Sequence, residues 1–191
     1  LYSSAASDVY KRQKAYIIII CILILAVIFD LRTYRIPNLL MLIGILVSAG
    51  GTFCEKGSGG LPEILAGIVI PIALLLLLHR FRMLGAGDIK LFTVIGGAAG
   101  VEVLHIMLYS FLAGGVLAVI HMLYHRSLVN RLQVFWKYVQ TCLITGHITP
   151  YDSGFDRGDT RNTVHFSIAI LIGYGTVSYT HLRAHETLAN L

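Results

Sequence analysis

The chain has 191 residues, of which 56% are hydrophobic and 13% are charged, and its formal net charge is +5. A water-soluble domain carries about a quarter charged residues, so this composition excludes an ordinary soluble globular protein. The basic residues flank long apolar runs, as they do in membrane proteins, which argues against nucleic-acid binding. We therefore expect one membrane-embedded domain with lipid as its surroundings.

The two ends of the chain differ in composition from everything between them. Residues 1–13 (LYSSAASDVYKRQ) are polar, and residues 177–191 (VSYTHLRAHETLANL) interrupt an apolar segment that has just begun. Both strings resemble translated adaptor or linker sequence, so we expect them to be non-native and set them aside. His181 and His185 are therefore not expected to belong to a functional site, and residues 14–176 are the predicted functional domain.

Apolar runs recur throughout this domain. A membrane-spanning helix needs about 20 apolar residues, and helices or closed barrels alone satisfy backbone polar groups in lipid. Because the runs lack the period-two alternation of a barrel, we expect an all-α membrane bundle with about six crossings, the last one cut short. The runs are residues 15–29, 39–53, 61–78, 89–101, 103–123 and 164–176.

Asp30 directly follows the first apolar run, in the segment FDLRTYRIPN. Pro37 suits the first turn of the next helix, because the N–H that proline lacks has no partner there. The segment from Asp30 to Asn38 is therefore expected to be a short turn that holds a carboxylate at the membrane edge.

Asp88 lies in the segment GAGDIK, between the third and fourth runs. Gly85 and Gly87 permit close backbone approach and unusual dihedral angles next to the acid, and Lys90 follows it. An ionisable residue at membrane depth is by default a functional candidate. Two such acids in one chain are stronger evidence than either alone.

The number of crossings places the two aspartates relative to the membrane. Two apolar runs separate Asp30 from Asp88, and an even number of crossings returns the chain to the same face. The segments around the two acids are rich in basic residues, whereas the segment between those two runs carries only Lys56, offset by Glu55. Basic residues favour the cytoplasmic side, so both acids are expected to face the cytoplasm. The basic residues in question are Arg32, Arg35, Arg80, Arg82 and Lys90.

Paired carboxyl groups suggest acid–base hydrolysis. Two carboxyls in one site do not both ionise readily, so one keeps a proton while the other activates water. Because Asp30 follows a helix end and Asp88 precedes a helix, helix dipoles favour Asp30 as the proton holder and Asp88 as the charged partner. No Ser–His–acid set is placed on one face by the sequence, and no H-E-x-x-H motif occurs.

Metal and cofactor sites are not expected. His121 and His125 have helical spacing but no third ligand. The cysteines (Cys21, Cys54 and Cys142) lack metal or disulfide spacing. The polar segment 146–162 lacks the glycine and terminal glutamate of a calcium loop, although it contains Asp152, Asp156 and Asp159.

Two further patterns concern helix packing. Residues 126–144 place apolar side chains at three- and four-residue spacing with basic residues between them, which predicts an amphipathic helix at the membrane surface. Small residues predict a close approach of the fourth and fifth helices. These are Gly96, Gly97, Gly100, Ala113, Gly114, Gly115 and Ala118.

The aspartate followed by R-I-P-N after the first run, together with G-A-G-D-I-K after the third, resembles the type IV prepilin peptidase family. The closest resemblance is to the small Flp/Tad-type members that lack an extra cytoplasmic domain, and it extends over residues 14–176. Larger members carry paired CxxC motifs between the first two spans and also methylate the new amino terminus. The short link between these spans here gives no basis for methylation.

The resemblance implies a GxGD aspartyl protease of the inner membrane that cleaves the basic leader of prepilins on the cytoplasmic side. It implies that Asp30 and Asp88 are catalytic. The supporting motif residues are Pro37, Asn38, Gly85, Gly87 and Lys90. The alternatives are another GxGD intramembrane protease, a small proton-coupled transporter, or a non-catalytic pilus-assembly component. Presenilin-type proteases place a Tyr-Asp pair within a span, whereas Phe29 precedes Asp30 here, and a transporter should show internal repeats.

Overall fold

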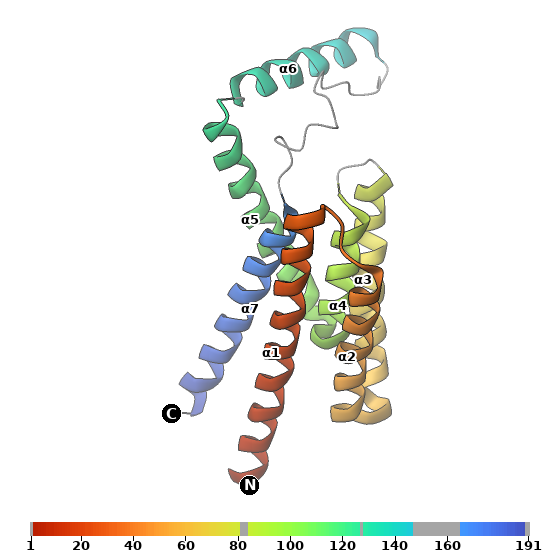
Figure 1. Ribbon diagram of the computed structural model, residues 1–191, viewed down its shortest axis with the longest axis vertical. Helices are drawn as coiled ribbons and strands as arrows, with labels where there is room; N and C mark the ends of the chain where they lie inside the picture. The colour runs from red at the N-terminus through yellow and green to blue at the C-terminus, as the bar shows by residue number, and fades with distance from the viewer. Residues whose placement is uncertain (1, 81–83, 127, 147–164, 190–191) are drawn as a thin grey trace. The chain divides into compact units, whose positions relative to one another are not determined.

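The computed structural model describes residues 2–80, 84–126, 128–146 and 165–189 (Figure 1). These residues form helices and no strand, which confirms the predicted all-α class. The chain divides into two compact units, Leu1–Gly114 with His165–Leu191 and Gly115–Val164. The elements are α1 (Tyr2–Thr33), α2 (Asn38–Lys56), η1 (Gly57–Gly60), α3 (Leu61–Arg80), α4 (Ala86–Ala99), η2 (Gly100–Glu102), α5 (Val103–Tyr124), α6 (Leu128–Thr145) and α7 (Phe166–Ala189).

Three helical stretches are long and apolar enough to cross a membrane: Tyr16–Thr33, Asn38–Arg80 and Ala86–Tyr124. The second stretch contains α2 and α3, and the third contains α4 and α5. A short 3-10 turn with a glycine of positive φ breaks each of these two, at Gly57 and Gly100. The chain is therefore an all-α membrane bundle, with a shorter apolar helix at the start of α7.

The helix α7 does not stop at residue 176, where the sequence suggested that the last crossing is cut off. It continues to Ala189, although its apolar part, Phe166–Thr180, is shorter than the other stretches. Val177 packs against the core and Ser178 is buried. The predicted limits of the native domain stay a prediction.

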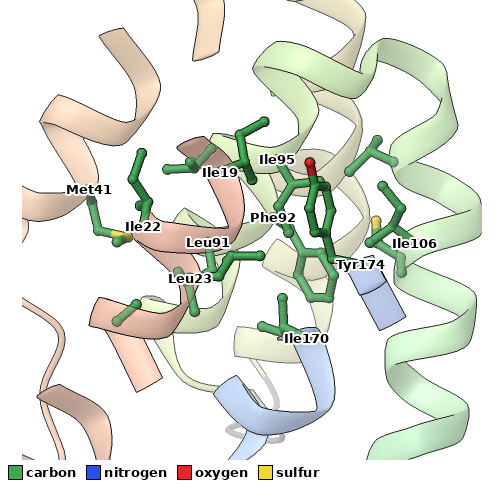
Figure 2. Packing of buried hydrophobic residues seen from close by; sticks show 14 of the residues in the cluster. Ile19, Ile22, Leu23, Met41, Leu91, Phe92, Ile95, Ile106, Ile170 and Tyr174 are labelled. Carbon is green, nitrogen blue, oxygen red and sulfur yellow. The ribbon is translucent and has the colours of Figure 1, made fainter. Parts of the chain in front are cut away.

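The helix α4 lies at the centre of the first unit. Every residue from 91 to 97 is buried, and the helix contacts α1, α2, α3 and α7. Figure 2 shows side chains of α1, α4 and α7 gathered in one apolar cluster, among them Leu23, Phe92 and Ile170. Because α4 carries Asp88 in its first turn, its central position brings that residue close to the neighbouring helices.

Two facing glycines allow a close contact between α3 and α4. A Cβ atom added to Gly67 of α3 would lie 1.9 Å from the carbonyl oxygen of Gly96 in α4, and a Cβ on Gly96 would lie as close to the Gly67 carbonyl. The predicted approach of the fourth and fifth helices through small residues is therefore wrong in its partners. Gly96 meets α3, Gly97 meets Ser48 of α2, and Gly114 of α5 meets Phe166 of α7.

Candidate active site

Asp30 lies in the last turn of α1, which continues past it to Thr33. The Tyr34 N–H donates to the Asp30 carbonyl at 2.9 Å, and Tyr34 adopts a left-handed conformation (φ 53) that ends the helix. The Thr33 hydroxyl also contacts the carbonyl oxygen of Phe29 at 2.8 Å. The helix end is therefore well defined by its own hydrogen bonds, and it fixes the backbone that carries the Asp30 carboxyl.

Two side chains from the start of α7 bind the Asp30 carboxyl. The Ser167 hydroxyl donates to Oδ2 at 2.6 Å, and His165 Nδ1 lies 3.2 Å from the same oxygen. The Asp30 side chain is 18% exposed and the His165 side chain 17%. The Tyr34 ring packs on the His165 imidazole with centroids 4.9 Å apart. The last turn of α1 and the first turn of α7 therefore form one polar cluster.

Asp88 occupies the third position of α4, after the helix cap at Gly85. The Gly85 N–H donates to Asp88 Oδ2 at 3.2 Å, and the Asp88 N–H donates to the Gly85 carbonyl at 3.2 Å. A carboxylate in the first turn of a helix also interacts favourably with the helix dipole. The local sequence therefore holds the Asp88 side chain against its own helix start.

The two sequence motifs touch each other. A Cβ atom on Gly87 would lie 3.3 Å from Ile36 Cδ1, so the glycine lets the segment before α2 pack on the start of α4. The Lys90 ammonium donates to Asn38 Oδ1 at 2.7 Å. Pro37, expected in the first turn of α2, is instead its N-cap. The RIPN segment and the GAGDIK segment therefore form one structural unit at one end of α4.

The contact between the motifs places the start of α4, which carries Asp88, beside the segment that follows Asp30. The helices that carry the two aspartates, α1 and α4, are also in contact with each other. Figure 1 shows the end of α1 and the starts of α4 and α7 at the same end of the first unit. This agrees with the crossing parity, which placed both acids on one face.

The sequence placed no serine, histidine and acid on one face, and this expectation is wrong. A serine, a histidine and an acid do come together on one face, as Ser167, His165 and Asp30. The arrangement differs from that of a serine hydrolase, in which the serine hydroxyl donates to the histidine. Here the Ser167 hydroxyl donates to the carboxylate, so histidine does not activate it as a nucleophile.

Sequence reasoning missed His165 and Ser167. They lie 135 and 137 positions after Asp30, and they belong to no recognisable motif. The number of membrane crossings could have indicated them, because it places the start of the last apolar run on the same face as the two aspartates. Polar side chains at the start of that run were therefore candidates for the same site.

The other candidates from the sequence belong to the second unit or lie outside the described residues. His121 and His125 pack ring to ring with centroids 4.5 Å apart, and within the described ranges no group of three potential metal ligands occurs. Asp152, Asp156 and Asp159 lie outside the described residues.

Comparison with known proteins gives one finding. A model of the type IV leader peptidase family matches residues 17–119, a stretch that contains both aspartates and both motifs. His165 and Ser167 follow this stretch. No curated protein and no solved structure matches the chain.

Proposed function

The chain belongs to the type IV leader peptidase family, and on that premise we propose that it is an aspartyl endopeptidase with a carboxyl dyad, Asp30 and Asp88. Its proposed substrates are type IV prepilins of the Flp-like kind, from which it removes the basic leader. The observation that carries this proposal is the contact between the two motifs, in which Lys90 donates to Asn38 and Gly87 packs on Ile36. The dyad supplies both proton transfers, so the proposal needs neither metal nor cofactor.

The proposed reaction is peptide hydrolysis by water. The charged carboxyl takes a proton from water, and the water oxygen forms a bond to the scissile carbonyl carbon. The protonated carboxyl then gives its proton to the leaving amine as the C–N bond breaks. The products are a free leader carboxylate and a new amino terminus on the mature pilin.

The proposed orientation places this chemistry at the cytoplasmic face of the inner membrane. Basic residues surround the aspartate-bearing end, at Arg32, Arg35 and Arg80, as the positive-inside bias requires. At the other end of the bundle, Lys56 is neutralised by an ion pair with Glu63. A basic prepilin leader stays on the cytoplasmic side for the same reason, so enzyme and cleavage site would meet there.

The test is cleavage of a prepilin-leader peptide by the full chain in lipid bilayers. Asp30→Asn and Asp88→Asn should each lower kcat by at least about 100-fold, because either change removes the acid or the base. Glu63→Gln is the matched control, since it neutralises an acid at the other end of the bundle, and it should cleave at the wild-type rate. Near-wild-type cleavage by either aspartate variant would overturn the dyad.

A further inference from the structure

Ser167 of α7 and His165, which directly precedes α7, converge on one oxygen of Asp30, and nothing in the two motifs accounts for them. We propose that Ser167 and His165 are positioning residues that hold Asp30 as the charged member of the dyad, an inference that rests on the proposed function. Ser167 is 1% exposed, and its hydroxyl lies 2.6 Å from Oδ2. A hydroxyl so deeply buried needs a partner, and the carboxylate supplies it.

The hydrogen bonds decide which carboxyl carries the charge. A hydrogen bond donated to a carboxylate favours its charged form. Asp30 receives the Ser167 hydroxyl and, with a proton on Nδ1, the His165 imidazole. Asp88 receives one backbone N–H, from Gly85. The side-chain donors therefore assign the charge to Asp30 and the proton to Asp88, which reverses the roles that helix dipoles suggested.

The two hydrogen bonds to Asp30 use one of its two carboxylate oxygens. Both donors bind Oδ2, and among the described residues neither contacts Oδ1. The free oxygen is the one able to accept a proton from water. The Tyr34 ring, packed on the imidazole at 4.9 Å, fixes the ring plane and hence the direction of Nδ1.

The packing of α7 on α1 does not depend on these polar contacts. Ala169, Ile170 and Tyr174 are fully or almost fully buried, and α7 contacts both α1 and α4. In lipid, van der Waals packing of such side chains contributes strongly to helix association. Loss of one hydroxyl or one imidazole should therefore leave the fold in place and affect the carboxyl alone.

The experiment compares conservative and disruptive variants of the full chain in lipid bilayers, with a prepilin-leader peptide as substrate. Ser167→Ala and His165→Phe remove the donor, and the phenylalanine keeps a ring against Tyr34. Both should lower kcat by about 10- to 100-fold, the effect of a hydrogen bond to a charged group, while KM changes by less than about two-fold. Ser167→Thr and His165→Asn keep a donor near its place and should recover most of the lost rate.

The controls separate the outcomes. Thr176→Val removes another hydroxyl of α7, one that bonds its own helix at Ile172, and His105→Phe removes a histidine at the start of α5; both should cleave normally. Wild-type rates for Ser167→Ala and His165→Phe, with Asp30→Asn inactive, would overturn the positioning role and leave the proposed function intact.

If no leader peptide is cleaved, the proposed function fails, and the contact between His165 and Asp30 can still be tested without substrate by NMR. In protein labelled with ¹⁵N-histidine, the Nδ1 resonance of His165, assigned by its loss in His165→Phe, should shift in Asp30→Asn. It should not shift in Glu63→Gln. An unchanged resonance in Asp30→Asn would overturn the proposed contact.

Discussion

At the scale of single residues, the hydrogen bond from Lys90 to Asn38 joins the two motifs. Its length is 2.7 Å and both side chains are exposed. The family resemblance made Lys90 a supporting residue of the motif around Asp88, and its ammonium binds Asn38, the first residue of α2. This hydrogen bond joins the start of α2 to the start of α4, where Asp88 lies.

This contact predicts a moderate effect of substitution. Lys90→Met keeps the length of the side chain and removes the donor, and we expect kcat/KM to fall by about 3- to 10-fold, because exposed polar pairs contribute little. Asn38→Asp keeps an acceptor and should retain activity. Lys56→Met, at the other end of the bundle, is the matched control in the peptide-cleavage assay. A loss from Lys90→Met as large as that from Asp88→Asn would place Lys90 in the chemistry itself.

At the scale of helices, the packing of α3 on α4 depends on two facing glycines. Backbone atoms form the obstacle at Gly96, with the Gly67 carbonyl oxygen 1.9 Å from an added Cβ. Since backbone cannot move aside as a side chain does, Gly96→Ala should lower the free energy of unfolding by about 3 kcal/mol or more. Gly51→Ala, where a Cβ meets nothing within 4 Å, should be neutral or stabilising by about 0.5–1 kcal/mol. Thermal unfolding in bicelles measures both, and equal stability of the two variants would contradict this packing.

The helix α6 offers a spectroscopic test of the predicted membrane-surface helix. A helix is present at Leu128–Thr145, and it contains the single tryptophan of the chain, Trp136, which is 62% exposed. Neighbouring apolar side chains, among them Leu132 and Val129, are exposed as well. An exposed apolar stripe with an aromatic residue is typical of a helix in the interface plane.

We therefore expect Trp136 fluorescence to be quenched in bilayers by lipids brominated near the headgroup more strongly than by lipids brominated near the chain end. Because no other tryptophan is present, the signal reports α6 alone, and Trp136→Phe gives the blank. Quenching by a water-soluble quencher alone would mean that α6 stands away from the bilayer.

At the scale of the whole molecule, local motifs were readable from the sequence and tertiary contacts were not. Asp30 and Asp88 stand out because short flanking segments mark them. Ser167 joins the site through the packing of α7, which depends on apolar contacts spread over the bundle. Gly96 was recognised as an interface residue, but its partner was misassigned, since a small side chain permits close approach without specifying which helix approaches. The same limit applies to α4, whose short run gave no sign of its central, buried place.

The orientation of the whole chain in the membrane can be measured by labelling its cysteines. The helix α2 begins beside Lys90 and ends at Lys56, and its 19 residues span about 28 Å, close to the thickness of the hydrocarbon core. Cys54, which is exposed, therefore lies at the opposite face from the aspartates. If the aspartates face the cytoplasm, a membrane-impermeant maleimide added to intact spheroplasts should label a variant that retains Cys54 alone.

A variant that retains Cys142 alone, on α6, serves as the opposite reporter. Three helices, α3, α4 and α5, separate Cys54 from α6. If each of them crosses the membrane, Cys142 lies on the opposite face from Cys54 and should be labelled only in inverted vesicles. Both variants use native cysteines, with Cys21→Ser in each, and peptide cleavage confirms that each is intact. Labelling of Cys54 in inverted vesicles and of Cys142 from outside would place the carboxyl pair on the external face. It would then separate the catalytic chemistry from the cytoplasmic prepilin leader and contradict the proposed substrate.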